Sequence, residues 1–369
     1  MTTINPIIKW WVTPKLPPED VFAEHNFFSQ WIIHPVKRRL ARWYLKLLQK
    51  YTKIIVIGIT GSAGKTTTKE MLAAILKLND RTVCTPKNVD SIYSIPNTIL
   101  TTPPWTKYLI LEMGVEYRGE MDFYLWLAKP DIGLITNIFP THTQFLENIE
   151  GVFKEKSKLV RELPSAGIAV LNSGDTKLKS LSGRLSSKII WFSPDINPIK
   201  QNANAAAALA KTLGIKDEKI KKGLTEYKKP AHRLHIINHA SGAMILDDSY
   251  NSNPWAALST LEYFNSIVKG EKIAVLGDML ELGNFDESAH RELGRHIAKS
   301  NFRMVVGIGK SSKFLIEEVN KYSKKTKTYL FAKAEDAIPT IKQELKKGVS
   351  VVVKGSRSMG LDKLVDALL

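Results

Sequence analysis

The chain has 369 residues, of which 44% are hydrophobic and 24% are charged, a composition that excludes a disordered or fibrous protein. Its 53 Lys and Arg against 36 Asp and Glu give a formal net charge of +17, which favours nucleotides, nucleic acid or an anionic membrane surface as partners. The single cysteine, Cys84, excludes an intrachain disulfide and fits a reducing cytoplasm. No apolar run reaches the roughly 20 residues of a spanning helix, and no signal-peptide pattern opens the chain. We therefore predict a cytoplasmic protein.

Residues 1–52 form a basic segment that holds half of the tryptophans. Between Val36 and Tyr51, apolar residues recur at helical spacing and basic residues fill the other face, which predicts an amphipathic helix. Such a helix can lie on an anionic bilayer, with peripheral contact through residues 35–51, or it can dock on its own domain. The predicted apolar face is Val36, Leu40, Trp43, Tyr44, Leu47, Leu48 and Tyr51, and the predicted basic face is Lys37, Arg38, Arg39, Arg42, Lys46 and Lys50.

Short β-rich apolar runs alternate with helical stretches along the rest of the chain, which is typical of an α/β protein with mostly parallel sheets. The first set of runs is "KIIVIGIT", "YLILEMG", "DIGLITNI" and "GIAVLN", and the second is "GAMILDDSYN", "KIAVLGDM", "RMVVGIG", "TYLFA" and "VSVVVKGS". The polar, proline-bearing stretch "LTEYKKPAHRL" separates the two sets. We therefore predict a central domain at 53–230 and a C-terminal domain at 231–369, after the N-terminal segment at 1–52.

The stretch "ITGSAGKTTT" at residues 59–68 has the parts of a phosphate-binding loop. A strand leads into a glycine-rich turn, and the turn leads into a helix that begins with Lys65 and Thr66. Backbone amides at a helix N-terminus, a lysine and a hydroxyl are the groups that hold a nucleotide's phosphates and its metal ion. The first glycine of the usual pattern is displaced, because Ile59 stands where that pattern has glycine. The predicted phosphate-binding residues are Gly61, Ser62, Ala63, Gly64, Lys65, Thr66 and Thr67.

This form of the loop, Gly-x-Thr-Gly-Ser-x-Gly-Lys-Thr-Thr, resembles the loop of the Mur ligase family. Further blocks that resemble the family follow in order: "LEMG", "RGEMDF", "KPDIGLITNIFPTH", "IEGVFKEKSKL", "NANAAAAL", "HRL", "LDDSYNSNP", "VLGDMLELG" and "VVKGSRSMG". They cover roughly residues 53–369 and are most similar to the family members that add D-alanyl-D-alanine. The resemblance implies a P-loop central domain, a Rossmann-like C-terminal domain, and ATP-dependent amide-bond formation in peptidoglycan precursor synthesis.

The resemblance also implies how ATP and metal are held. Lys65 and the loop amides would bind the phosphates of ATP, and Thr66 with Glu112 would bind one Mg²⁺. His142 would help to bind a second Mg²⁺. Lys156 resembles a lysine that CO₂ carbamylates, so that it becomes an anionic metal ligand. From the residues alone, a solvated carboxylate, a surface histidine and a basic helix face are the alternatives for Glu112, His142 and Lys156.

Other positions are implied as nucleotide and substrate contacts. Asn202 matches an asparagine that meets adenine, although Asn204 is close enough to be confused with it, and Arg233 and Asp248 match residues that bind ATP. An ordinary turn is the alternative for "DDSYN", because Asp, Ser and Asn favour turns. A cation and a hydroxyl after a late strand can hold the carboxylate of an incoming amine. The implied substrate-binding residues are Asn88, Tyr250, Asn251, Asn253, Lys354, Ser356 and Arg357.

Three departures from the family pattern affect the predicted substrate. The N-terminal domain that holds the UDP end of the substrate is replaced by residues 1–52. In "KNVDSIYSIP", Asp90, Ser91 and Ser94 replace asparagines and a glycine, and a β-rich insertion after "IIWFSPD" is reduced to a few residues. The resemblance predicts UDP-MurNAc-peptide and D-Ala-D-Ala as substrates. We predict no nucleic-acid partner, and a monomer is favoured. Because of the three departures, two alternatives stay open: a Mur-type ligase with another carboxylate and amine, and a membrane-associated nucleotide-binding scaffold.

Overall fold

The computed structural model describes Trp11, residues 32–86 and residues 89–369. The chain divides into two compact units. Unit 1 comprises Met1–Phe139, Phe145–Pro194 and Gln201–Lys228, and unit 2 comprises Pro140–Gln144, Asp195–Lys200 and Lys229–Leu369. Among the described residues, no helix combines the length and the apolar character that crossing a membrane requires. Asn88, a predicted substrate contact, lies outside the described residues.

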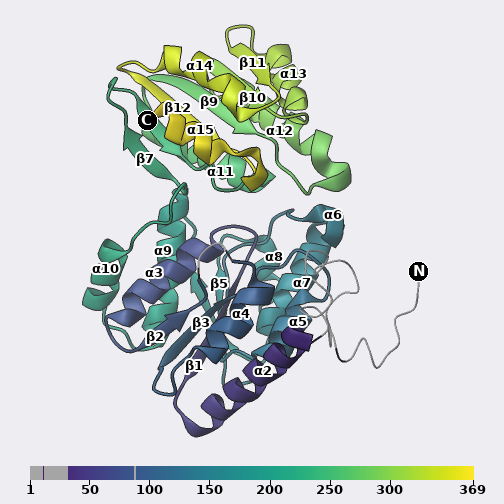
Figure 1. The fold of residues 1–369 in the computed structure, drawn as a ribbon, viewed down its shortest axis with the longest axis vertical. Helices are drawn as coiled ribbons and strands as arrows, with labels where there is room; N and C mark the ends of the chain where they lie inside the picture. Colours follow the sequence, from purple (N-terminus) through teal and green to yellow (C-terminus); the bar gives the residue numbers. More distant parts are fainter. Residues whose placement is uncertain (1–10, 12–31, 87–88) are drawn as a thin grey trace. The chain divides into compact units, whose positions relative to one another are not determined.

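A six-stranded parallel sheet forms the centre of unit 1, in the order β2-β3-β1-β4-β5-β6 (Figure 1). Its strands are β1 (Ile55–Thr60), β2 (Thr82–Cys84), β3 (Tyr108–Glu112), β4 (Ile132–Ile135), β5 (Ile168–Asn172) and β6 (Lys188–Phe192). In this register Ile59 pairs with Glu112, and Thr60 pairs with Ile135. The ends of β1, β3 and β4 therefore meet at one edge of the sheet, where ligands of open α/β sheets bind.

Helices cover both faces of this sheet. Val56, Leu109 and Leu111 belong to the core that also contains residues of α2, α4, α5 and α7. The alternate residues Ile57 and Ile110 are fully buried as well, so they belong to the opposite face, where α3 packs. The helices that begin before residue 229 are α2 (His34–Tyr51), α3 (Lys65–Lys77), α4 (Ser91–Leu100), α5 (Glu120–Leu127), α6 (Thr143–Leu146), α7 (Ile149–Arg161), α8 (Thr176–Lys179), α9 (Pro198–Thr212) and α10 (Asp217–Glu226).

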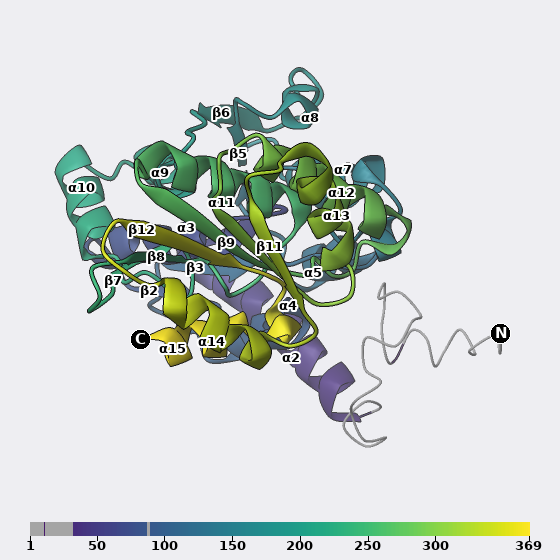
Figure 2. The ribbon, with the colours of Figure 1, turned by 90° about the horizontal axis from the view of Figure 1, so that it is seen from above.

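Unit 2 has a second six-stranded sheet, in the order β11-β10-β9-β12-β8-β7. All neighbours are parallel except β7 and β8, which pair antiparallel. Helices α11, α12 and α13 cover one face, and α14 and α15 cover the other (Figure 2). The elements are β7 (His235–Asn238), β8 (Met244–Asp247), α11 (Pro254–Ile267), β9 (Glu271–Gly277), η2 (Gly283–Phe285), α12 (Asp286–Ala298), β10 (Met304–Ile308), α13 (Ser312–Tyr322), β11 (Lys327–Phe331), α14 (Ala334–Glu344), β12 (Val349–Lys354), η3 (Arg357–Met359) and α15 (Leu361–Leu368).

The predicted α/β class is confirmed: unit 1 has the parallel sheet of a P-loop domain, and unit 2 has a Rossmann-like sheet. Every apolar run that the sequence indicated contains a strand of one of the two sheets. The sequence did not indicate β2, β6 or β7. These are edge strands, two of them at the ends of the first sheet and one at the end of the second.

Helix α2 is present and docks on its own domain, but its predicted faces are only partly correct: Leu48 is buried and Tyr44 packs against the core as predicted, whereas other residues differ. The buried face consists of Pro35, Arg38, Ala41, Leu45 and Leu48, and the helix packs on α4 and α5. Arg38 was predicted on the solvated basic face, yet it is buried. Its guanidinium lies 5.2 Å from the centre of the Phe123 ring, which provides a cation–π contact. Val36, Leu40 and Trp43, which were predicted on the apolar face, are exposed.

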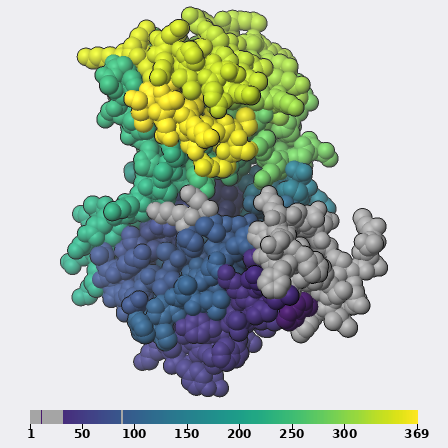
Figure 3. Space-filling view, in the orientation of Figure 1, coloured from purple at the N-terminus to yellow at the C-terminus, as the bar shows by residue number. Residues whose placement is uncertain are grey.

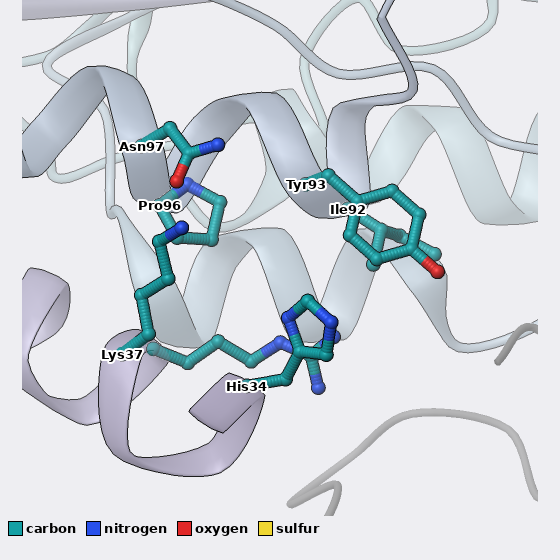
Figure 4. A pocket seen from close by; sticks show the side chains of 7 residues that line it. His34, Lys37, Ile92, Tyr93, Pro96 and Asn97 are labelled. Atoms are coloured by element: carbon teal, nitrogen blue, oxygen red, sulfur yellow. The ribbon is translucent and has the colours of Figure 1, made fainter. Parts of the chain in front are cut away.

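A small cavity lies at the contact of α2 with α4 (Figure 4). Its volume is about 30 Å³, which is room for roughly one or two water molecules. Its lining residues are His34, Lys37, Arg38, Ile92, Tyr93, Pro96 and Asn97. The His34 and Tyr93 rings are 5.3 Å apart. This space is far too small for a nucleotide, so the candidate site must be sought at the edge of the sheet.

Candidate active site

The glycine-rich loop after β1 is fixed by the residues that follow β4. Asn137 accepts hydrogen bonds from two loop amides: its carbonyl oxygen from the Ser62 N–H at 3.0 Å, and its side-chain Oδ1 from the Ala63 N–H at 2.8 Å. The Thr136 hydroxyl donates to the Ala63 carbonyl at 2.6 Å. The amides of Ser62 and Ala63 thus hold the loop in place. The first amides of an α-helix have no carbonyl partner within the helix, so the start of α3 suits an anion.

Two glycines of the loop have backbone angles that other residues rarely adopt. Gly61 has φ +146° and Gly64, which precedes α3, has φ +81°. A Cβ on Gly61 would lie 1.9 Å from Oγ1 of Thr136. A Cβ on Gly64 would lie 2.3 Å from Oδ1 of Asn202. The loop therefore needs glycine at both positions for conformation and for space.

We expect Gly61→Ala to destabilise the protein and to weaken nucleotide binding, because the new methyl group meets Thr136 and the backbone is strained. Strain of this kind costs roughly 1–3 kcal/mol before the clash is added. Gly183→Ala is the matched control, since Gly183 has φ +71° with nothing within 4 Å of the new Cβ. Thermal unfolding should show a larger loss for the Gly61 variant. Equal losses would contradict a steric role for Thr136.

The side chains of Lys65, Thr66 and Glu112 gather at the carboxyl edge of the sheet in unit 1. Nζ of Lys65 donates to the Gly61 carbonyl at 2.9 Å, so the lysine folds back over the loop. The Thr66 hydroxyl donates to Oε1 of Glu112 at 2.8 Å. The other carboxylate oxygen of Glu112 lies 3.3 Å from Nζ of Lys69, which is fully buried on α3. Lys69 was not among the residues predicted for the site, because its pairing with Glu112 depends on which strand lies next to β1.

The departures from the family pattern after β2 support this corner of the site. The Ser91 hydroxyl donates to the Glu112 carbonyl at 3.0 Å and accepts from the Gly114 N–H at 2.8 Å. Asp90 caps α4, because its carboxylate accepts from the Ile92 N–H at 3.0 Å. Ser94 is buried inside the same helix. Ser91 and Asp90 thus fix the backbone around Glu112.

Lys156, on α7, is fully buried. Its Nζ donates to the Val115 carbonyl at 3.2 Å. Burial, and after it the positive charge of Lys65, lower the pKa of Lys156 to about 7, against the opposing influence of Glu120, Glu116 and Glu155. A lysine with this pKa is largely neutral at slightly alkaline pH, and only a neutral amine can react with CO₂. The Val115 carbonyl that Lys156 contacts belongs to the segment that follows β3 and Glu112, and a shared site with Lys65 stays a prediction.

Acidic residues surround Lys156, and the sequence analysis did not single them out. Burial raises the pKa of Glu120 to about 8, although its carboxylate accepts from the amides of Tyr117 and Glu116. Glu155 accepts from the Gly119 N–H at 2.9 Å and from Nζ of Lys158 at 2.6 Å. Lys158, which stands where the family often has Glu, also pairs with Asp122 at 2.7 Å. Its charge is therefore compensated within the domain.

Two predicted contacts in unit 1 are now distinguished. Asn202 is buried on α9 with Oδ1 beside Gly64, whereas Asn204 donates to the Ser193 carbonyl at 3.1 Å. Asn202 is therefore the asparagine that lies next to the loop. Its role toward adenine stays a prediction.

In unit 2, two guanidinium groups flank the ring of Tyr250. The guanidinium of Arg233 lies 4.1 Å from the ring centre and that of Arg357 lies 5.2 Å from it. Nε of Arg233 is buried without a hydrogen-bond partner among the described residues. Arg233 and Arg357 are thus held beside the same ring, where their positive charges can bind an anion.

Other predicted contacts in unit 2 hold the domain together. Nζ of Lys354 donates to Oδ2 of Asp248 at 2.6 Å and to the Asn251 carbonyl at 2.9 Å, and its side chain is buried. The same Oδ2 accepts from the Thr260 hydroxyl at 2.7 Å. Asn253 caps α11 by accepting from the Ala256 N–H at 2.8 Å. These contacts agree with the alternative that "DDSYN" is a structural turn, and the substrate roles of Asp248, Asn251, Asn253 and Lys354 stay predictions.

Ser356 and Arg357 follow β12. The Ser356 hydroxyl accepts from the Leu280 N–H at 2.9 Å. The side chain of Arg357 is 56% exposed and pairs with Asp362. Of the cations predicted to hold a substrate carboxylate, Arg357 is the accessible one, because Lys354 is enclosed.

His142 belongs to unit 2 by its contacts, whereas Lys65, Thr66, Glu112 and Lys156 belong to unit 1. Nδ1 of His142 lies 2.6 Å from Oε2 of Glu281. Both residues have a left-handed backbone, with φ +52° and +64°. The hydrogen bond from His142 lowers the pKa of Glu281. Glu281 lies in the family-like stretch "VLGDMLELG", but no role was predicted for it. In the structure it is the hydrogen-bond partner that orients His142.

The described residues contain no group of three or more His, Cys, Asp or Glu arranged to hold a metal ion. Mg²⁺, however, usually takes only one or two protein oxygens and keeps phosphate oxygens and waters as its other ligands. The adjacent oxygens of Thr66 and Glu112, 2.8 Å apart, fit that requirement. A carboxylate formed on Lys156 would add a further oxygen ligand, so the residues present fit Mg²⁺ together with a nucleotide.

The parallel sheet, the glycine-rich loop and the helix that begins at Lys65 define a P-loop nucleotide-binding fold, and comparisons with known proteins give the family. The profile of the Mur ligase middle domain matches residues 59–232. That of the Mur ligase glutamate ligase domain matches residues 232–357. The chain belongs to the Mur ligase family, as its loop and motifs predicted.

Several of the relatives and solved structures that the chain matches are named for one ligase. A UDP-N-acetylmuramoyl-tripeptide–D-alanyl-D-alanine ligase of Bacillus subtilis is 32% identical over 90% of this chain and 79% of that protein. Its Escherichia coli counterpart is 29% identical over 85% and 76%. The crystal structure of MurF from Acinetobacter baumannii superposes with a TM-score of 0.81 at 25% identity, over 91% of this chain and 80% of that one. An ADP complex of MurF from Thermotoga maritima, 24% identical, has the same fold with a TM-score of 0.80, over 91% and 83%.

Proposed function

We propose that the protein is an ATP-dependent ligase that adds D-alanyl-D-alanine to a UDP-MurNAc-peptide in peptidoglycan precursor synthesis. The observation that supports the proposal is the contact of Thr66 with Glu112 beside the loop over which Lys65 folds, together with the buried Lys156 at the Val115 carbonyl, three residues after Glu112. Relatives with this printed activity match 90% of the chain. The chain has the cations and the oxygen ligands that such a reaction needs.

The reaction has two steps. A carboxylate oxygen of the peptide attacks the γ-phosphorus of ATP, and the bond to the bridging oxygen breaks, which gives an acyl phosphate and ADP. The amine of D-Ala-D-Ala then attacks the acyl carbon, phosphate leaves, and the nitrogen loses a proton. Because two anions must approach each other in the first step, cations dominate the site. Lys65, at the start of α3, stabilises the charge on the transferred phosphoryl group.

Thr66 and Glu112 would hold one Mg²⁺, and the resemblance implies a second ion near His142 and a carbamylated Lys156. Bound Mg²⁺ would offset phosphate charge and orient the phosphate oxygens. Lys69 and Ser91 keep Glu112 in place for this task. The burial that makes the Lys156 amine largely neutral prepares it for carbamylation, and the resulting carboxylate would carry the negative charge that a metal ligand needs.

Residues of unit 2 would contact the remaining parts of the substrates. Arg233, whose Nε has no hydrogen-bond partner among the described residues, suits a phosphate. Arg357, exposed beside Tyr250, suits the carboxylate of the incoming amine. Asn202 of unit 1, beside the loop, suits the adenine base.

The second candidate is a Mur-type ligase with a different carboxylate and amine. The observation that favours it is the segment after β2, where Asp90 and Ser91 serve as a helix cap and a backbone brace in place of the family's asparagines. A membrane-associated nucleotide-binding scaffold is less well supported. Such a scaffold would not need a buried lysine with a pKa of about 7 beside the phosphate loop.

An ADP-release assay with purified protein tests the function. We expect release that requires ATP, Mg²⁺, UDP-MurNAc-tripeptide and D-Ala-D-Ala together, with the amide product confirmed by mass spectrometry. The panel should include other peptide carboxylates and other amines. Turnover with a different pair alone would move the assignment to the second candidate, and nucleotide binding without turnover on any pair would favour the scaffold.

The protein's basic N-terminal helix suggests a place for this activity. We infer that the protein works in the cytoplasm with peripheral contact to the inner face of the membrane through residues 35–51. The net charge of +17 favours an anionic surface.

A further inference from the structure

Helix α2 has two apolar stripes, and only one of them packs on the protein. The inner stripe, with Ala41, Leu45 and Leu48, is part of the core of unit 1. The outer stripe faces solvent and follows a spacing of three and four residues from Ile33 to Trp43, which keeps it on one side of the helix, and the half-buried Leu47 lies between Trp43 and Tyr51. Its members are Ile33, Val36, Leu40, Trp43 and Tyr51.

The outer stripe is strongly exposed for its residue types. Leu40 is 51% exposed, Trp43 is 62% exposed and Tyr51 is 71% exposed. Scattered single apolar residues at a surface need no explanation, but a continuous stripe of large side chains along one helix is a mark of an interaction site. Helix α2 lies at the surface of unit 1, where its residues are seen in purple (Figure 3).

The charge around the stripe is of one sign. Helix α2 contains no acidic residue, and the cations Lys37, Lys46 and Lys50 accompany the stripe along its length. Lys46 and Lys50 are exposed. Two arginines of the helix are directed elsewhere: Arg38 is buried, and the guanidinium of Arg42 lies 4.8 Å from the centre of the Trp126 ring. The exposed face thus combines apolar side chains with lysines, of which Lys50 has its Nζ 5.1 Å from the centre of the Tyr51 ring.

We propose that the outer stripe of α2 is a docking surface for an anionic lipid bilayer, with Leu40 and Trp43 entering the interface between headgroups and acyl chains. This inference rests on the proposed peripheral position and specifies its face, which is the side of the helix that the unit does not bury. Trp and Tyr favour this interface because their rings are apolar with a polar edge. Lysines bind anionic headgroups from beside the helix. A basic partner surface is disfavoured, because α2 has no acidic residue to pair with it.

Sedimentation of the full chain with vesicles tests the proposal. We expect binding to phosphatidylglycerol and phosphatidylcholine mixtures that is roughly tenfold or more above binding to phosphatidylcholine alone, and that falls with salt. The double variant Leu40→Ser with Trp43→Ser should lower binding to the mixed vesicles by roughly tenfold or more. Trp105→Ser is the matched control, because Trp105 is another exposed tryptophan of unit 1, at 68%, and lies outside α2.

A second pair of variants separates charge from apolar contact. Lys46→Glu with Lys50→Glu should abolish the preference for anionic lipid, whereas Lys324→Glu with Lys325→Glu, an exposed lysine pair of unit 2, should not. All variants should keep the parent's thermal unfolding temperature, because none of these side chains is buried. ADP release without vesicles should also be unchanged, so a failure of the enzyme assay leaves the vesicle result interpretable, and the reverse holds as well.

Three results would overturn the proposal. One is no sedimentation of the full chain with anionic vesicles. Another is sedimentation that the Leu40 and Trp43 changes leave intact, which would assign binding to other residues. The third is a doubled mass in light scattering that the same double variant returns to a monomer, which would make the stripe a contact between two copies of the chain.

Discussion

Replacing Lys65 with alanine is expected to slow ATP-dependent ADP release by roughly 10²–10³-fold, because a preorganised cation or donor aimed at developing charge contributes about that much. Nζ of Lys65 already lies over the phosphate-binding loop, bonded to the Gly61 carbonyl at 2.9 Å. The transferred phosphoryl group gains negative charge at this place, and no neutral methyl group can stabilise it. Initial rates at saturating substrates give the measurement.

Lys77→Ala is the control for Lys65→Ala, since Lys77 is the exposed last residue of the same helix. It should leave the rate within about twofold, as surface substitutions away from a site usually do. The Lys65 variant should unfold at nearly the parent temperature, so that a slow rate is not a folding defect. A Lys65 variant that turns over at the parent rate would remove the loop from the mechanism.

The Lys65 site was predictable because its signals are local. Glycines at Gly61 and Gly64, a lysine and a threonine stand together in a few residues, and the apolar run before them marks a buried strand. The pairing of Thr66 with Glu112 was implied by the resemblance to the Mur ligases, and both residues lie at the carboxyl edge of a parallel sheet, where ligands bind. Local patterns of this kind require only the order of the elements, and the structure has that order.

The residues that hold this site in place were not predictable in the same way. Lys69 pairs with Glu112 and donates to the Thr85 carbonyl at 2.7 Å, and Asn137, in the segment that follows β4, accepts hydrogen bonds from two loop amides. Their roles depend on which strands are neighbours in the sheet. The order β3-β1-β4 cannot be inferred from any single segment of the sequence. A buried lysine or asparagine has no periodic pattern of its own.

Helix α2 shows a different limit of sequence patterns. Its apolar residues occupy two stripes, so a single hydrophobic face could not be assigned from spacing alone. Arg38 then lies on the buried stripe because α5 offers the Phe123 ring, a partner that no helical periodicity can reveal. The short edge strands were not predicted for a related reason. Strand β2 has only 3 residues, and its position depends on its pairing with β3.

Lys156→Ala is expected to slow ADP release by roughly 10²–10³-fold, because it removes the group that would become an anionic ligand after carbamylation. Lys154→Ala, an exposed position on the same helix, should leave the rate nearly unchanged. Short carboxylates such as acetate should restore part of the activity of the Lys156 variant by supplying the missing charge. A ¹³C carbamate signal should form in the parent protein with ¹³C-bicarbonate and be absent from the variant.

The pH dependence follows from the pKa of Lys156, which burial lowers to about 7. Carbamylation joins the neutral amine to CO₂ with loss of a proton, so the carbamate signal should grow as pH rises from about 6 to about 8. In the unfolded chain, Lys156 has a pKa of about 10.4. Between pH 7 and 10 the unfolded chain therefore binds a proton that the folded chain does not, and this residue's contribution to the free energy of unfolding rises with pH across that window.

Lys156→Met removes the titrating group and keeps most of the side chain's volume. It should flatten this part of the pH profile of unfolding, while Lys154→Met should not. A Lys156→Met variant that loses activity but keeps the parent's pH dependence of unfolding would contradict this account. In that case Lys156 would not change its protonation between pH 7 and 10, and its pKa would not be lowered to about 7. Full activity of Lys156→Met in CO₂-free buffer would exclude a carbamate from the reaction, because methionine has no amine to carry it.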